Sequence, residues 1–311
     1  MRQTRLNVIA FPGAPNLPIY AAIEQGYFAA AGLEVNLVTT PSSVSQFQRF
    51  GAGEFDIAFT AFDNVVAYRE GQGAAKLDPL PDFRVLMGAT QIGLSAVVAP
   101  EIATANDLAG KTLALDAVGT GFAFVLYEML ARRGLPPGAY EPVAVGATPE
   151  RWAAVKAGTH AGTITIEPFT SLAKAAGFRV LAESREDFPA YQGGVVAARR
   201  DWAEAHEAEA TAFLAACLQG VRWVLDPANR EAAGALLAAR MPEIKPAVVD
   251  AVLASLISPR TGLTPQGEIL PDGMRAVLDL RSRYGRPQTL LTDIDRYLLL
   301  GPYQAARAKI G

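Results

Sequence analysis

The sequence has little cysteine and histidine. Its 311 residues include one cysteine and two histidines, so a disulfide within the chain is impossible. Cys217 lies among apolar residues at helical spacing, which predicts a buried thiol. A catalytic cysteine normally needs a histidine partner, and we interpret His160 and His206 as incidental. We therefore predict no metal site and no catalytic nucleophile.

The sequence also lacks a long uncharged apolar run and an excess of basic residues. Glu, Gln or Arg interrupts the apolar stretches every few positions, well short of the roughly 18 residues that a membrane-spanning helix needs. The formal net charge is −3, so no long-range field attracts nucleic acid or an anionic membrane. We exclude both as partners.

A secretory leader is not visible at the start of the sequence. Residues 1–5 lead directly into an apolar strand pattern, without an apolar leader core or a small-residue cleavage site. Two alternatives stay open: a cytoplasmic protein, or an exported protein whose leader has been removed.

Strand and helix patterns alternate along the first two thirds of the chain, which predicts an α/β fold. Half of the residues are apolar, and the length favours two lobes. Two apolar strands separated by a short break at 91–93 suggest a crossing between lobes, and 191–198 suggests a return. The pattern beyond Asp201 is almost wholly helical. Neither a dinucleotide-binding glycine motif nor a Walker-type lysine is present, so we predict no phosphate cofactor.

The segment from Phe11 to Leu33 places a proline-rich polar turn between a strand and a helix start. Pro18 suits the first helical turn because its missing N–H would be unpaired there anyway. In open α/β sheets the ligand lies outside the carboxyl ends of the strands. Asn16 is therefore a candidate ligand contact; alternatively, its side chain only closes the turn.

Several short motifs resemble one family in their order and spacing. They are Ala14-Pro15, Glu24-Gln-Gly-Tyr-Phe28, Gly32-Leu-Glu-Val35, Gly53-Glu-Phe-Asp-Ile-Ala58, Asp107-Leu-Ala-Gly-Lys-Thr112, Gly119-Thr-Gly121, Glu167-Pro168 and Leu291-Thr-Asp293. Together they resemble the solute-binding proteins of ABC importers for nitrate, sulfonates, taurine and thiamine precursors, the NMT1/THI5-like family. The resemblance covers nearly the whole chain.

This resemblance implies the two-lobed periplasmic-binding-protein fold of type II, in which each lobe is a mixed sheet flanked by helices. Lobe 1 would comprise residues 1–93 and 194–311, and lobe 2 residues 94–193, with hinge crossings at Gln91–Ala96 and Tyr191–Val196. The function implied is capture of a small organic molecule by closure of the lobes and delivery to an ABC permease. We expect a monomer in the periplasm or cell envelope. Some eukaryotic relatives that make the thiamine pyrimidine carry a cysteine-rich motif, which this chain lacks.

The other candidate ligand contacts follow strand ends or lie at the crossings, and each has a structural alternative. Ser42 and Ser43 offer hydroxyls, although one of them is expected to cap a helix. Thr60, Phe62 and Asp63 form a polar and aromatic turn, with Phe62 as a stacking surface and Asp63 as an acceptor. Core packing and N-capping are the respective alternatives.

In the second lobe, Gly119, Thr120 and Gly121 resemble an anion cradle at a helix start. Glu167 is expected to face the cleft; alternatively, it lies in a surface turn. At the crossings, Gln91 and Tyr191 are candidates, and packing at the hinge is an equal alternative for Tyr191.

The turns expected at the cleft contain no Lys or Arg. Because arginine is the common partner of a strong anion, this composition argues against nitrate, sulfate and phosphate. It favours a neutral or zwitterionic heterocycle, or a small organic acid. A second hypothesis is a cytoplasmic enzyme on the same scaffold, a pyrimidine-precursor synthase or small-metabolite lyase with Asp63 or Glu167 as general base. A ligand-sensing subunit is a third.

Overall fold

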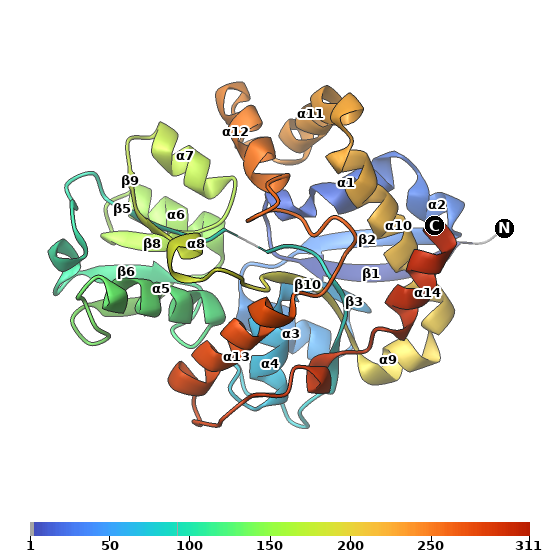
Figure 1. Cartoon of the computed structure of the whole chain (residues 1–311), viewed down its shortest axis with the longest axis horizontal. Helices are drawn as coiled ribbons and strands as arrows, with labels where there is room; N and C mark the ends of the chain where they lie inside the picture. Colours follow the sequence, from blue (N-terminus) through green and yellow to red (C-terminus); the bar gives the residue numbers. More distant parts are fainter. Residues whose placement is uncertain (1–2, 92) are drawn as a thin grey trace.

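The computed structural model describes residues 3–91 and 93–311, and in this part of the chain two five-stranded sheets lie side by side (Figure 1). The first sheet has the order β2 (Leu33–Thr39), β1 (Thr4–Ala10), β3 (Ile57–Ala61), β10 (Gly194–Arg199), β4 (Phe83–Gly88). The second has the order β7 (Glu141–Ala144), β6 (Thr112–Leu115), β8 (Gly162–Thr165), β5 (Ser95–Val98), β9 (Arg179–Glu183). In each sheet four strands run in the same direction, and the crossing strand, β10 or β5, pairs antiparallel with both of its neighbours.

Helices flank both sheets, so each sheet with its helices forms a lobe (Figure 1). The helices of the N-terminal part are α1 (Leu17–Glu24), α2 (Tyr27–Ala30), α3 (Ser43–Gly51) and α4 (Phe62–Arg69). The second lobe carries α5 (Gly121–Arg132), α6 (Thr148–Lys156), α7 (Phe169–Ala175) and α8 (Ser184–Asp187). The C-terminal third contains α9 (Arg200–Ala205), α10 (Glu207–Leu225), α11 (Arg230–Arg240), α12 (Pro246–Leu256), α13 (Pro271–Tyr284) and α14 (Gly301–Ile310).

Alternating side chains of β1 pack on opposite faces of the first sheet, as the period of two in a strand requires. Leu6 and Val8 belong to an apolar cluster that includes Phe213 of α10. Ile9 points to the other face and joins a cluster with Phe47 of α3. The sheet is thus buried between two helical layers, which explains the nearly continuous apolar character of β1.

The chain leaves the first sheet between β4 and β5 and returns between α8 and β10. A third segment, 261–267, runs beside the first crossing: Gln91 N donates to Gly262 O (2.9 Å) and Thr264 N donates to Ala89 O (3.0 Å). The sequence pattern did not predict this third segment. Ile92, inside the predicted crossing Gln91–Ala96, lies outside the described residues.

The predicted two-lobed α/β fold with mixed sheets is confirmed, and Cys217 is buried as predicted. The predicted N-cap at Asp63 is wrong. Helix α4 begins at Phe62, so Ala61 occupies the N-cap position and Asp63 lies inside the first turn. The lobe boundaries at 93/94 and 193/194 stay predictions.

Candidate functional site

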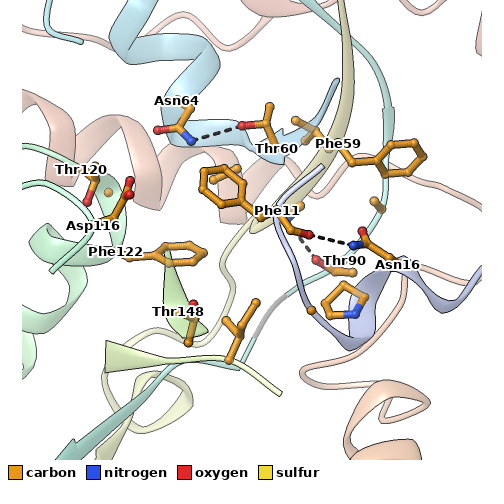
Figure 2. A pocket seen from close by; sticks show the side chains of 18 of the residues that line it. Phe11, Asn16, Phe59, Thr60, Asn64, Thr90, Asp116, Thr120, Phe122 and Thr148 are labelled. Carbon is orange, nitrogen blue, oxygen red and sulfur yellow. Dashed lines mark hydrogen bonds between the residues drawn. The ribbon is translucent and has the colours of Figure 1, made fainter. Parts of the chain in front are cut away.

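A pocket of about 800 Å³, part of it open to solvent, lies between the two lobes (Figure 2). Its walls come from turns that follow parallel strands: Phe11 after β1, Asp116 after β6 and Ile166 after β8. This is the position that the topology of open α/β sheets favours for a ligand. The remaining lining residues are Gly13, Pro15, Asn16, Phe59, Thr60, Ala61, Asn64, Ala89, Thr90, Thr120, Gly121, Phe122, Thr148, Arg151, Gly194 and Val195.

Two phenylalanines from opposite lobes line the pocket. Phe11 follows β1 and Phe122 lies in the first turn of α5, and both side chains are half-buried. Figure 2 shows both rings at the cavity. Within residues 3–91 and 93–311 neither ring stacks on another aromatic side chain. Both rings thus lie at the pocket without an aromatic partner of their own among the described residues.

Amide and hydroxyl groups supply most of the polar lining. Asn16 Nδ2 donates to Phe11 O (2.7 Å), which ties the first turn, and Asn64 Nδ2 donates to Thr60 Oγ1 (3.1 Å). Thr120 Oγ1 donates to Ala117 O (3.0 Å). These bonds orient the side chains before any ligand arrives and leave acceptor oxygens in the lining.

Arg151 is the cation of the pocket, and its side chain is 3% exposed. Nε donates to Thr163 Oγ1 (3.2 Å), Nη1 to Gly146 O (2.8 Å), and Nη2 to Thr148 Oγ1 and Ile164 O (both 3.0 Å). Burial lowers the pKa of Arg151 to about 10, so the guanidinium is charged at neutral pH.

Asp116 is the anion of the pocket, and it contacts the other lobe. Its two carboxylate oxygens accept from Ser43 N, at the start of α3, at 3.2 and 3.1 Å. A carboxylate at a helix N-terminus is stabilised by the positive end of the helix dipole. Asp116 therefore binds the second lobe to the first.

Three further hydrogen bonds join the two lobes. Ala147 N donates to Pro41 O (2.8 Å), and Ala14 N donates to Glu167 O (3.2 Å). Gly121 N donates to Asp63 Oδ2 (2.6 Å). The structure therefore has the lobes in contact around the pocket.

Four of the residues predicted from sequence line this pocket, namely Asn16, Thr60, Thr120 and Gly121. Four others from the first lobe lie behind it. Ser42 caps α3 by accepting from Ser45 N (3.1 Å), and Ser43 is buried with its hydroxyl unpaired in the described structure. Phe62 is fully buried and packs edge-on against Tyr297 at 5.7 Å, because it occupies the core side of α4. Asp63 is buried in an ion pair with Arg281.

The remaining predicted residues also lie outside this pocket. Gln91 Nε2 donates to Pro259 O (2.6 Å) at the crossing, and Gly119 lies in the turn before α5. Tyr191 is 5% exposed, and its hydroxyl has no partner among the described residues. Glu167 lines a second, smaller pocket and accepts from Ser171 N (3.2 Å) and Oγ (3.1 Å). Burial raises the pKa of Glu167, and the Ser171 hydrogen bonds partly offset that rise.

Sequence reasoning missed the two pocket phenylalanines and both pocket charges. Asp116 directly follows β6, so the strand-end rule that selected Thr60 also applies to it. The turns expected at the cleft contain no Lys or Arg, but Arg151 lies in the first turn of α6 and lines the pocket, so the absence of a cation from those turns does not extend to the whole pocket.

Among the described residues, no group of three His, Cys, Asp or Glu side chains is placed to hold a metal ion. The same part of the chain contains no helix with both the length and the apolar character needed to cross a membrane.

Comparison with solved structures shows similarity to binding proteins and to an enzyme. The alkanesulfonate-binding protein SsuA from Xanthomonas axonopodis pv. citri, bound to MOPS, is 18% identical with a TM-score of 0.74, covering 97% of this chain and 98% of its own. The periplasmic nitrate-binding protein NrtA from Synechocystis PCC 6803 is 14% identical with a TM-score of 0.78, covering 99% and 85%. The desulfurization enzyme DSZB is 15% identical with a TM-score of 0.66, covering 99% of each chain. At these identities the similarity establishes the fold.

A search of curated protein sequences found no significant match. The family model described as NMT1/THI5 like matches residues 15–230. The chain therefore belongs to the NMT1/THI5-like family and has the two-lobed fold of the periplasmic binding proteins.

Proposed function

We propose that this protein is the solute-binding component of an ABC importer and captures a small organic molecule between its lobes. One observation carries the proposal: both lobes wall the larger pocket, and hydrogen bonds between the lobes surround it. A ligand that contacts both walls binds the closed arrangement more tightly than the open one and therefore stabilises the closed arrangement. The partner is then a membrane permease, and the protein acts in the periplasm or cell envelope.

The competing hypothesis is an enzyme with Asp63 or Glu167 as general base. Asp63 is a poor base here, because both of its oxygens contact Arg281 and one also accepts from Gly121 N. Glu167 faces only the smaller pocket. If turnover of a candidate substrate were found and lost in Glu167→Gln with binding retained, the enzyme hypothesis would replace ours.

The test uses protein that has been unfolded in guanidinium and refolded to remove any retained ligand. Pyrimidines, aliphatic sulfonates, amino acids and aromatic or aliphatic carboxylates are screened by thermal shift, since a bound ligand raises stability by mass action. Small-angle scattering then measures compaction with each hit. No thermal shift and no compaction across the panel would contradict the proposal.

A closure-blocking variant sharpens this test. A Cβ at Gly13 would lie 3.1 Å from Ile166 Cδ1 and 3.5 Å from Glu167 O, both in the opposite lobe. Gly13→Leu is therefore expected to separate the lobes and weaken every ligand. Gly301→Leu is the matched control, because a Cβ there meets nothing within 4 Å.

A further inference from the structure

Arg151 is a buried cation that forms no ion pair with a carboxylate in the part of the chain that the structure describes. Within residues 3–91 and 93–311 no carboxylate oxygen lies within 4.0 Å of its guanidinium. Its neighbours are the hydroxyls of Thr148 and Thr163 and the carbonyl oxygens of Gly146 and Ile164. Neutral oxygens fix the position of the charge but do not neutralise it, and an unpaired buried charge is costly.

The guanidinium also has donor capacity to spare. It carries five N–H groups, and four of them have the protein acceptors named above. The fifth belongs to Nη1. Because Arg151 lines the pocket, a ligand anion bound there would supply the missing negative charge.

Asp116 does not neutralise Arg151 directly, although it lines the same pocket. It attracts the guanidinium only over a longer range, and both of its oxygens contact Ser43 N instead. The start of α3 offsets the charge of Asp116. Asp116 thus accepts from the N-terminus of α3, where the helix dipole is positive, whereas Arg151 contacts only hydroxyl and carbonyl oxygens of the described residues.

The apolar part of the wall selects the rest of the ligand. Phe11 and Phe122 present half-buried rings without an aromatic partner in the described structure, and each comes from a different lobe. An aromatic ring packs on such surfaces with more specific geometry than an aliphatic chain.

On the assumption that the proposed binding function is correct, we propose that the ligand is an aromatic acid. Its ring packs against Phe11 and Phe122, and its anionic group is neutralised by Arg151. Closure of the lobes removes both ends of the molecule from water together. A carboxylate and a sulfonate share this chemistry, and the experiment separates them.

The test compares matched acids and amides on refolded wild-type protein by isothermal titration calorimetry. Benzoate is paired with benzamide, and benzenesulfonate with benzenesulfonamide. We expect the acid of at least one pair to bind about tenfold to a hundredfold more tightly, the range of a charge-assisted hydrogen bond. Cyclohexanecarboxylate, which lacks the flat ring, should bind more weakly than benzoate.

Variants then assign the effect to Arg151. Arg151→Met should abolish the preference for the acid. Arg151→Lys keeps the positive charge and should therefore retain part of that preference. Lys156→Met is the matched control, because Lys156 is an exposed cation of the same helix. Phe122→Leu keeps Arg151 and should reduce the preference for benzoate over cyclohexanecarboxylate, so the inference is testable even if Arg151→Met does not fold.

Two results would overturn the inference. One is that the amides bind as tightly as the acids; the other is that only non-aromatic or neutral ligands bind. Either result leaves the proposed solute-binding function in place, because a ligand still binds and compacts the protein. Failure of the proposed function is different, since no compound would then bind or compact the lobes.

Discussion

Asp63 of α4 and Arg281 of α13 form a buried ion pair although 218 positions separate them in the sequence. Nε of Arg281 donates to Asp63 Oδ1 at 2.9 Å, and Nη2 contacts Oδ2. The guanidinium also lies 4.6 Å from the ring centroid of Phe124 in α5. One pair thus connects the first lobe, the C-terminal third and the second lobe.

Breaking this pair should strongly destabilise the protein. Asp63→Ala leaves the guanidinium of Arg281 buried and unpaired, so we expect the free energy of unfolding to fall by about 3–5 kcal/mol. Urea denaturation followed by circular dichroism measures the change. As a control, Asp201→Ala removes an 84% exposed carboxylate that lies 3.8 Å from Arg199, and less than about 1 kcal/mol is expected. Equal effects of the two substitutions would contradict this account.

Phe62 at the start of α4 and Phe122 at the start of α5 should respond differently to truncation to alanine. Phe62 is fully buried, so Phe62→Ala should cost about 3–5 kcal/mol of stability. Phe122 is half-buried at the pocket, so Phe122→Ala should cost about 1 kcal/mol, since its side chain gains about half as much from burial. Calorimetric binding to any ligand found by the thermal-shift screen should weaken in Phe122→Ala. If only Phe62→Ala weakened binding, the aromatic contact would belong to Phe62 instead.

Asp116 should affect closure of the lobes, whereas Ser42 should not. Both carboxylate oxygens of Asp116 bind α3 from the other lobe, while Ser42 caps the same helix from within its own lobe. We expect Asp116→Ala to shift the lobes toward an open arrangement, visible as a larger radius of gyration in scattering. Ser42→Ala should cost about 1 kcal/mol of stability and leave the radius unchanged. An unchanged radius in Asp116→Ala would argue against a role for this contact in closure.

Glu167 should make stability depend on pH. Burial raises its pKa in the folded protein above the ordinary value of 4.5, so the folded state binds more protons than the unfolded state between the two pKa values. The contribution of Glu167 to stability is then complete below pH 4.5 and is lost as the pH rises through the folded pKa.

Glu167→Gln removes this titration and keeps an acceptor for Ser171. The variant should therefore gain stability relative to wild type as the pH is raised from 4 to 7, as measured by urea denaturation at each pH. Wild-type and variant curves that stay parallel over this range would show that the raised pKa is absent.

Much of the fold follows from local pattern. Strand and helix patterns predicted the α/β fold, and the breaks near 91–93 and 191–194 marked where the chain passes between sheets. The position of Asn16 and Thr60 at the pocket also followed from sequence: Asn16 lies in the turn that follows β1, Thr60 lies near the carboxyl end of β3, and the carboxyl ends of parallel strands meet at one edge of the sheet.

The sequence by itself determined the order of strands and helices, the buried thiol of Cys217 and the family. Only the tertiary structure decided what each polar side chain contacts. Asp63 lies near a strand end, as a ligand contact would, and the sequence pattern therefore selected it. In the structure its carboxylate forms an ion pair with Arg281, which comes from a distant helix. Arg151 lies within a helix rather than in a strand-end turn, so the sequence pattern did not select it. Its place in the pocket depends on how α6 packs on the second sheet. Charge pairing depends on distances across the fold, which local periodicity does not encode.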